Sequence, residues 1–248
     1  ASEEKKEPGT EEKTQKTPLI ARYIEKLDQA AEPRTRKDMP PDERAEIEIA
    51  LANYDAEIAY LDHHLGRLLD AIESLPGGEN IWLIITGDHG ESFGESGYFF
   101  QHGQFASPEQ TEVPFIVVAP GILPVRHVAW VSHVDVAPTL LDLAGLPPLR
   151  EASGLSLAPL VLDGVPLPRR TLYAETPREL SAYYEDGYLR IRPGPPRSAE
   201  SLRNPLDPAG DLRWQRFRRT QGGGWKTADR PDQLPASVQE FLRERAAK

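Results

Sequence analysis

Three residues able to bind a metal ion lie close together near the middle of the chain. Asp88 and His89 follow an apolar run at residues 81–86 and stand between two glycines, and His102 follows a glycine-rich stretch. A carboxylate and neutral imidazoles are good ligands for a divalent cation, and glycines let the backbone approach a bound anion. The pattern therefore predicts a metal site in which Asp88 and His89 are ligands.

A purely structural interpretation of the same residues exists. Asp88 could cap the turn that follows it, and His89 could pack against the edge of a sheet. For an isolated Asp-His pair this structural role is the commoner one. The second His-Gly at His102, together with strands predicted on either side, favours the metal site.

The elements around these residues predict an α/β fold. Residues 81–86 and 113–121 are apolar runs typical of buried strands in a parallel sheet, and residues 128–131 are a third, short candidate. Residues 135–145 predict a short helix with Asp135 as its N-cap. In open α/β sheets ligands bind beyond the carboxyl ends of the strands, which is where the Asp-His pair falls.

A long helix is predicted from Asp42 to the Pro-Gly-Gly at residues 76–78. His63 and His64 fall in it, but adjacent helical positions point about 100° apart, so a packing or solvated role is expected rather than a ligand pair. One apolar stripe recurs along the helix at spacings of three and four: Ile47, Leu51, Tyr54, Ile58, Leu61, Leu65, Leu68 and Ile72.

The C-terminal third differs from the rest of the chain in its composition and in the elements that it predicts. Residues 171–175 are a strand candidate, and residues 181–184 and 188–192, separated by Glu-Asp-Gly, predict a hairpin. Pro, Gly and Arg dominate residues 193–235, which predicts loop with little regular structure. A short helix is expected at residues 237–247.

These expectations divide the chain into three parts. The first is a polar tail and linker whose residues 19–27 could form a short helix. The others are an α/β part and a small subdomain with a loop-rich tail. The boundaries are 1–41, 42–165 and 166–248.

Composition limits the possible functions. The net charge of -10 argues against nucleic acid as the main partner and leaves room for a cation site built from carboxylates. The absence of cysteine excludes disulfides, thiolate zinc sites and a cysteine nucleophile. No apolar run approaches the roughly 20 residues of a transmembrane helix. An Ala-first start without Met or a signal region indicates a piece of a longer protein.

Several motifs resemble one family, in the same order along the chain. Residues 86–95 resemble the "S/T-D-H-G-E-x-x-G-E" signature of the sulfatase branch of the alkaline-phosphatase superfamily. Residues 101–103 and 108–114 resemble the "H-G … Q-x-x-V-P" of membrane-anchored sulfatase-like hydrolases and phosphoethanolamine transferases. Residues 131–142 resemble the "S-x-x-D-x-x-P-T-L-L-D" helix, residues 154–157 resemble "G-x-S-L", and the long helix also matches.

The resemblance implies a partial alkaline-phosphatase-like fold, with a mostly parallel sheet flanked by helices and a small C-terminal hairpin subdomain. Asp88 and His89 match metal ligands of the family. His102 matches a catalytic histidine that binds the metal or the sulfuryl or phosphoryl oxygens. Three further polar residues could brace these groups or act directly: Glu91, Glu95 and Gln110.

The implied activity is metal-dependent hydrolysis of a small anionic sulfate or phosphate ester. The resemblance favours calcium as the cation, with zinc or manganese possible. Two alternatives from other classes are a phosphoethanolamine-type transferase of the same superfamily and a non-catalytic binding module that retains the fold. The compartment stays open, and frequent export within the family favours the periplasm or the extracellular space.

The chain departs from the family pattern on the N-terminal side. The family's nucleophile is a formylglycine made from Cys in C-x-P-x-R, or a Ser or Thr, and its first metal carboxylates follow an early apolar strand. This sequence has no Cys and no such strand, and Thr10, Thr14 and Thr17 lie in a polar tail. We therefore expect the chain to carry half of the metal site, to lack the nucleophile, and to require the N-terminal half of the catalytic domain as its partner.

Overall fold

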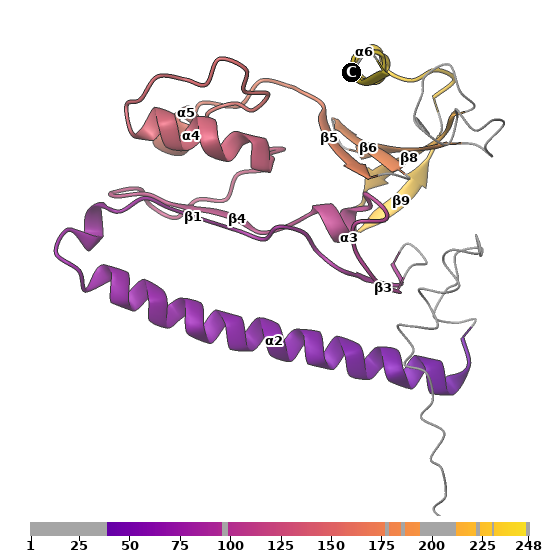
Figure 1. Ribbon diagram of the computed structural model, residues 1–248, viewed down its shortest axis with the longest axis horizontal. Coiled ribbons are helices and arrows are strands. Elements are labelled where there is room, and N and C mark those ends of the chain that lie inside the picture. Colours follow the sequence, from indigo (N-terminus) through magenta and orange to yellow (C-terminus); the bar gives the residue numbers. More distant parts are fainter. Residues whose placement is uncertain are drawn as a thin grey trace, which may run out of the picture.

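The computed structural model places three groups of elements around the candidate site (Figure 1). The helix α2 (Pro41–Glu73) runs along one side, a strand pair with short helices lies above it, and a larger sheet stands at one end. The predicted helix at residues 19–27 lies outside the described residues. The structure describes residues 39–95, 99–176, 179–184, 187–193, 212–221, 224–229 and 231–246.

The long helix is confirmed, and it is anchored at its N-terminal end. Pro41 takes the first helical position, where its fixed φ suits the helix and its missing N–H costs nothing. Asp42 therefore lies in the first turn rather than at the N-cap, which is Pro40. The start of the apolar stripe packs into a small core that contains Met39, Ile47 and Phe99.

The two strands predicted around the site form a pair. β1 (Leu83–Thr86) lies antiparallel to β4 (Phe115–Val118), with Thr86 opposite Phe115. The α/β fold class is confirmed, but the strand direction differs from the expectation, because every pairing among the described strands is antiparallel. An apolar run reports burial and carries no information about strand direction.

Short elements between β1 and β4 frame the site. β2 (Ser92–Phe93) pairs with β3 (Phe99–Gln101), and α3 (Pro108–Thr111) precedes β4; the short 3-10 helix η2 (Gly78–Asn80) precedes β1. The third strand predicted at residues 128–131 is wrong. That stretch is irregular and Val128 is fully exposed, because the described residues offer it no neighbouring strand to pair with.

The helix predicted at residues 135–145 is confirmed as α4 (Val136–Leu143), preceded by the 3-10 helix η3 (His133–Asp135). Asp135 is the N-cap residue of α4, as predicted, but its side chain makes no capping hydrogen bond to that helix. Its buried carboxylate accepts the N–H groups of Ser132 and Leu155, each at 2.9 Å, and a hydrogen bond from Arg170 Nη1 at 2.7 Å. This carboxylate thus connects α4 to the segments on either side of α5 (Ala158–Asp163).

Burial raises the pKa of Asp135, but hydrogen bonds from Arg170, Leu155 and Ser132 outweigh burial and lower the pKa below its ordinary value. The carboxylate is therefore ionised at neutral pH. Both of its oxygens contact Arg170, which makes this a bidentate ion pair.

The C-terminal part is a five-stranded antiparallel sheet in the order β5-β6-β7-β8-β9. The strand at 171–175 and the hairpin are confirmed as β5 (Leu172–Thr176), β6 (Glu179–Tyr184) and β7 (Gly187–Pro193). The helix α6 (Ala236–Ala246) is also confirmed, and it covers a core formed by Leu180, Leu189, Ile191, Val238 and Leu242.

The loop predicted over residues 193–235 is wrong over two stretches and confirmed at residues 231–235, which are irregular. β8 (Leu212–Arg219) and β9 (Trp225–Ala228) extend the sheet. The first residues of β8 alternate between half-buried and exposed positions, and three of the four exposed residues of the strand are arginines: Arg213, Arg218 and Arg219. The abundance of Pro, Gly and Arg around this segment obscured a strand whose polar face points to solvent. None of the helices in the described ranges has the length and apolar character needed to cross a bilayer.

Candidate metal and ester-binding site

Asp88 and His89 lie on the turn that follows β1. Their side chains are 89% and 45% exposed, so neither is buried within the described residues. Asp88 Oδ1 accepts the backbone N–H of His89 at 2.9 Å. That hydrogen bond is the largest of the causes that lower the pKa of Asp88 below its ordinary value, so Asp88 is a carboxylate at neutral pH.

The turn is held against α3 by one backbone and one side-chain hydrogen bond. The Gly90 N–H donates to the carbonyl oxygen of Gln110 at 2.9 Å, and Gln110 Nε2 donates to Ser92 Oγ at 2.7 Å. A Cβ at Gly90 would lie 2.1 Å from the Glu109 carbonyl oxygen, so only glycine allows this approach. The sequence Asp-His-Gly-Glu is therefore fixed on the framework rather than left as an open loop.

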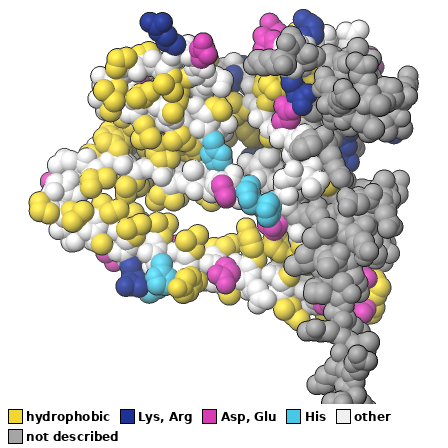
Figure 2. Space-filling view, viewed as in Figure 1, with side chains coloured by type: hydrophobic (Ala, Val, Ile, Leu, Met, Phe, Trp, Pro, Cys, Tyr) yellow, Lys and Arg dark blue, Asp and Glu magenta, His cyan; other side chains and the backbone are white. Residues whose placement is uncertain are grey.

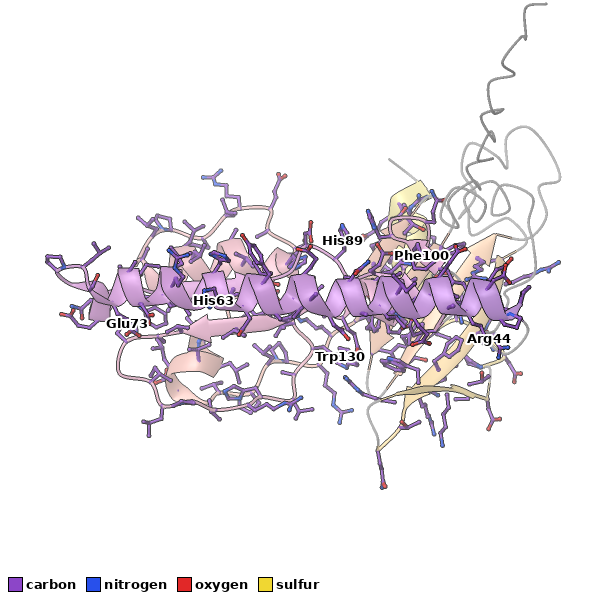
Figure 3. The ribbon with its side chains drawn as sticks, turned by 90° about the horizontal axis from the view of Figure 1, so that it is seen from below. Arg44, His63, Glu73, His89, Phe100 and Trp130 are labelled. Carbon is purple, nitrogen blue, oxygen red and sulfur yellow. The ribbon has the colours of Figure 1, made fainter. Side chains whose placement is uncertain are left out.

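His102 reaches the same place from β3. Phe100 has a φ of 55°, a left-handed conformation that is uncommon outside glycine, two residues before His102. The rings of His89 and His102 stack with centroids 4.2 Å apart and an interplanar angle of 22°. The fold thus brings together the three residues predicted from the sequence. In Figure 3, His89 and Phe100 appear on the same side of α2.

The ring nitrogens of both histidines are oriented by specific hydrogen bonds. His89 Nδ1 lies 2.9 Å from the Gly90 carbonyl oxygen, and His102 Nδ1 lies 2.9 Å from Glu91 Oε2. Both partners can only accept, so each Nδ1 carries a proton, and in the neutral imidazole each Nε2 then keeps a lone pair. This is the usual arrangement of metal-binding histidines, whose second nitrogen donates to a carbonyl or a carboxylate.

The donor set fits an open half of a cation site. His89 Nε2 and Asp88 Oδ2 face each other at 3.7 Å, and both carry lone pairs that a cation between them would satisfy. Within the described part of the chain, no group of three or more His, Cys, Asp or Glu side chains is arranged to hold a metal ion by itself. Further ligands are needed to close the site.

A cavity of about 610 Å³ adjoins these residues. Asp88, His89 and His102 line it, together with Trp130 and residues of the C-terminal sheet, including Tyr183. Figure 2 shows histidine and acidic side chains grouped on this face beside an opening that separates α2 from the elements above it. The volume is in the range of small-molecule sites.

The larger, N-terminal part of the chain matches known sulfatases. A family model described as Sulfatase matches residues 4–146, which is more than half of the chain and includes Asp88, His89 and His102. The chain belongs to the sulfatase family. The described five-stranded sheet lies beyond the matched residues.

Several curated sulfatases are similar over part of their length. The sulfatase chain is 37% identical over 112 residues to a choline-sulfatase of Rhizobium meliloti (strain 1021), covering 44% of this chain and 21% of that protein. It is 36% identical over 121 residues to arylsulfatase K of Gallus gallus, covering 48% of this chain and 22% of that protein. The sulfatase chain thus spans about a fifth of the length of these relatives.

A solved structure shows the same fold. The phosphonate monoester hydrolase SpPMH from Silicibacter pomeroyi matches 91% of the sulfatase chain and 46% of its own chain, with a TM-score of 0.62 and 18% sequence identity. A similarity at this level of identity supports the architecture described above.

Sequence reasoning missed the cavity wall that the C-terminal sheet supplies. Tyr183 OH lies 2.5 Å from Thr111 Oγ1, and burial raises the pKa of the Tyr183 phenol far above its ordinary value. Arg219, on the strand that the composition obscured, lines the cavity 3.4 Å from Glu112. The hairpin of β6 and β7 was predicted from the sequence, but its contact with the site was not.

The other histidines of the described residues lie on other elements, and one of them, His133, lines the same cavity. His63 belongs to α2, where Figure 3 labels it, and His64 packs against Tyr60 with ring centroids 4.3 Å apart. His127 is exposed. His133 Nε2 lies 3.2 Å from Thr86 Oγ1, which links η3 to the end of β1.

Proposed function

We propose that this chain provides part of the active site of a metal-dependent sulfatase-type ester hydrolase. One observation supports this most directly. The end of β1 and the segment after β3 place a carboxylate and two imidazole nitrogens together, with each imidazole oriented by a hydrogen bond on its other nitrogen. Membership of the sulfatase family supplies the reaction class.

Asp88 and His89 would hold a divalent cation through Oδ2 and Nε2, and His102 would present its Nε2 to the cation or to the ester oxygens. When bound, the cation would supply charge stabilisation for the sulfuryl or phosphoryl oxygens. Because the proton of His102 is held on Nδ1, its Nε2 accepts in the neutral state and donates once the imidazole is protonated. The residues of this chain therefore orient and stabilise the ester group.

The identity of the cation follows from how many imidazoles bind it. Calcium prefers oxygen ligands, so it would suit a site that uses Asp88 with carboxylates from elsewhere. Manganese or zinc would suit a site in which both His89 and His102 are ligands. A comparison of calcium, manganese and zinc in one binding assay separates these cases.

We also propose that the N-terminal portion of a sulfatase catalytic domain completes the site and supplies the nucleophile. The chain contains no cysteine, the source of the formylglycine in the resembled motif. It also presents an apolar surface suited to such a partner. Three stripe residues of α2 are more than half exposed: Ile58 at 51%, Leu61 at 65% and Leu68 at 56%.

The strand pair supports the same partner. β1 pairs with β4 alone among the described strands, so each has an edge that could accept another strand. Ile116 and Val118 on β4 are 51% and 42% exposed. Two-stranded pairs are marginal by themselves, and further strands would cover both these residues and the stripe of α2.

The test measures hydrolysis of 4-nitrophenyl sulfate by the chain alone and after it is combined with a sulfatase N-terminal portion that carries the nucleophile. We expect no turnover by the chain alone and metal-dependent turnover by the combination. Asp88→Asn should lower that turnover at least about 100-fold, the scale of losing one electrostatic group. Asp62→Asn, an exposed aspartate of α2, is the matched control and should have no effect.

Two outcomes would contradict the proposal. One is metal-dependent hydrolysis by the chain alone, and the other is full activity of Asp88→Asn in the combination. A phosphoethanolamine-type transferase would instead transfer the group to an acceptor, so the product distinguishes it from a hydrolase. A non-catalytic module would show no turnover with any N-terminal portion.

A further inference from the structure

The carboxylate of Glu91 contacts both its own loop and the ring of His102. Its Oε1 accepts the backbone N–H of Ser92 at 3.0 Å, and its Oε2 lies 2.9 Å from His102 Nδ1. The Glu91 side chain is 22% exposed, whereas the His102 side chain is 52% exposed. A partly buried carboxylate that makes two hydrogen bonds thus contacts a more exposed imidazole.

The loop that carries Glu91 is itself fixed on both sides. Gly90 donates its N–H to the Gln110 carbonyl oxygen, and the fully buried Ser92 accepts from Gln110 Nε2. The position of the carboxylate is therefore determined by the α3 framework rather than by His102. A residue that positions His102 must itself be held by other parts of the fold, as Glu91 is.

We propose that Glu91 is a positioning residue that holds His102 in the tautomer with the proton on Nδ1. The lone pair on Nε2 then remains available in the direction of the site. His89 gains the same tautomer from a backbone carbonyl, which substitution cannot remove, so Glu91 is the side chain through which the tautomer of the pair can be changed. The consequence for ester hydrolysis rests on the proposed function, whereas the tautomer itself does not.

The experiment records the ¹⁵N signals of the imidazole nitrogens in histidine-labelled chain at about pH 8, where an ordinary imidazole is neutral. We expect His102 to show a protonated Nδ1 and an unprotonated Nε2. Glu91→Met keeps a similar shape and removes the acceptor, so His102 should shift towards the Nε2–H tautomer. Glu91→Gln keeps an oxygen that can accept from Nδ1–H, so it should retain the original tautomer more fully.

Glu95→Met is the matched control. Glu95 lies in the same loop, but its Oε2 accepts the Phe93 backbone N–H at 2.7 Å, so its loss should leave the His102 tautomer unchanged. Backbone amide spectra of the variants should overlay for β6 and β7, which shows that the fold is retained. A purely structural role would alter Met and Gln variants alike and would not move a proton between ring nitrogens.

The outcomes separate this inference from the proposed function. If His102 carries its proton on Nε2 in the unsubstituted chain, or if Glu91→Met leaves the tautomer unchanged, the inference is wrong whatever the activity. If the tautomer shifts as expected, the inference stands even where no metal binds. If metal does bind, Glu91→Met should weaken it about 10- to 100-fold, the usual effect of removing such a partner.

Discussion

The C-terminal sheet and the strand pair at the site differ in how completely each is covered. The five-stranded sheet encloses a core in which Leu180, Leu189 and Ile191 are fully buried. The β1–β4 pair has no fully buried residue, and half of the eight stripe residues of α2 are exposed. The sheet thus encloses a core of its own, whereas the region that carries Asp88 and His89 exposes apolar surface, as the proposed N-terminal partner requires.

The contrast has a functional meaning. The residues that could bind a cation or an ester lie in the incompletely covered region. The five-stranded sheet forms one wall of the cavity beside them. Arg170 connects the sheet to the strand pair through η3, because it lies just before β5 and pairs with the buried Asp135 of η3. His133 of η3 in turn lies 3.2 Å from Thr86 of β1. Substitutions in the two regions should therefore have very different effects on the chain.

The largest effect is expected for Arg170→Leu. This change leaves the Asp135 carboxylate buried without its ionic partner, which typically costs about 3–5 kcal/mol of unfolding free energy. Urea unfolding followed by circular dichroism measures the loss. Arg169→Leu, at the exposed neighbouring arginine, is the control and should stay within about 0.5 kcal/mol. Equal stability of the two variants would show that Arg170 does not link the regions.

The next largest effect is expected in the core of the sheet. Leu180→Ala removes a fully buried side chain and should lower the unfolding free energy by about 2–5 kcal/mol. Leu61→Ala, the same substitution at a stripe residue that is 65% exposed, should change it by no more than about 0.5 kcal/mol. Comparable losses at Leu61 and Leu180 would mean that α2 is already packed in the chain alone.

The pH dependence of the unfolding free energy tests the Asp135–Arg170 ion pair with a smaller effect. The pKa of Asp135 is lowered in the folded chain, so its contribution to stability is present above the unfolded value of about 3.9 and is lost as the pH falls below it. Arg170→Leu removes the main stabilising partner of the carboxylate. Its stability deficit relative to the unsubstituted chain should therefore shrink on acidification. A deficit that is constant from neutral pH to about pH 3 would contradict this assignment.

The smallest effect is expected for Thr86→Val, which removes the hydroxyl that meets His133 Nε2 at 3.2 Å. Thr86 is exposed, so the loss should be about 1 kcal/mol or less. Hydrogen exchange should nevertheless show faster opening at the end of β1 and no change in β6 and β7. Uniform acceleration across both regions would mean that they unfold as one unit.

The sequence predicted the elements whose signal is local. It predicted the helix α2 from its apolar stripe, β1 and β4 from their apolar runs, and the hairpin of β6 and β7. It also predicted the turn that carries Asp88 and His89. The strand direction was not predicted, because burial on two faces does not encode it. β8 was missed because arginines occupy four of its eight positions and obscure the alternation of its apolar residues. The contact between Glu91 and His102 joins residues on different segments, which spacing along the chain cannot reveal.

The central claim is that Asp88, His89 and His102 form one half of a divalent cation site. Paramagnetic broadening by Mn²⁺ detects even weak binding to the chain alone, in spectra of the imidazole and backbone signals. The signals of these three residues should broaden selectively, and the effect should disappear in Asp88→Asn, while any broadening at the His63-His64 pair stays the same. Broadening that is absent at the cluster, or that persists unchanged in Asp88→Asn, would contradict the claim.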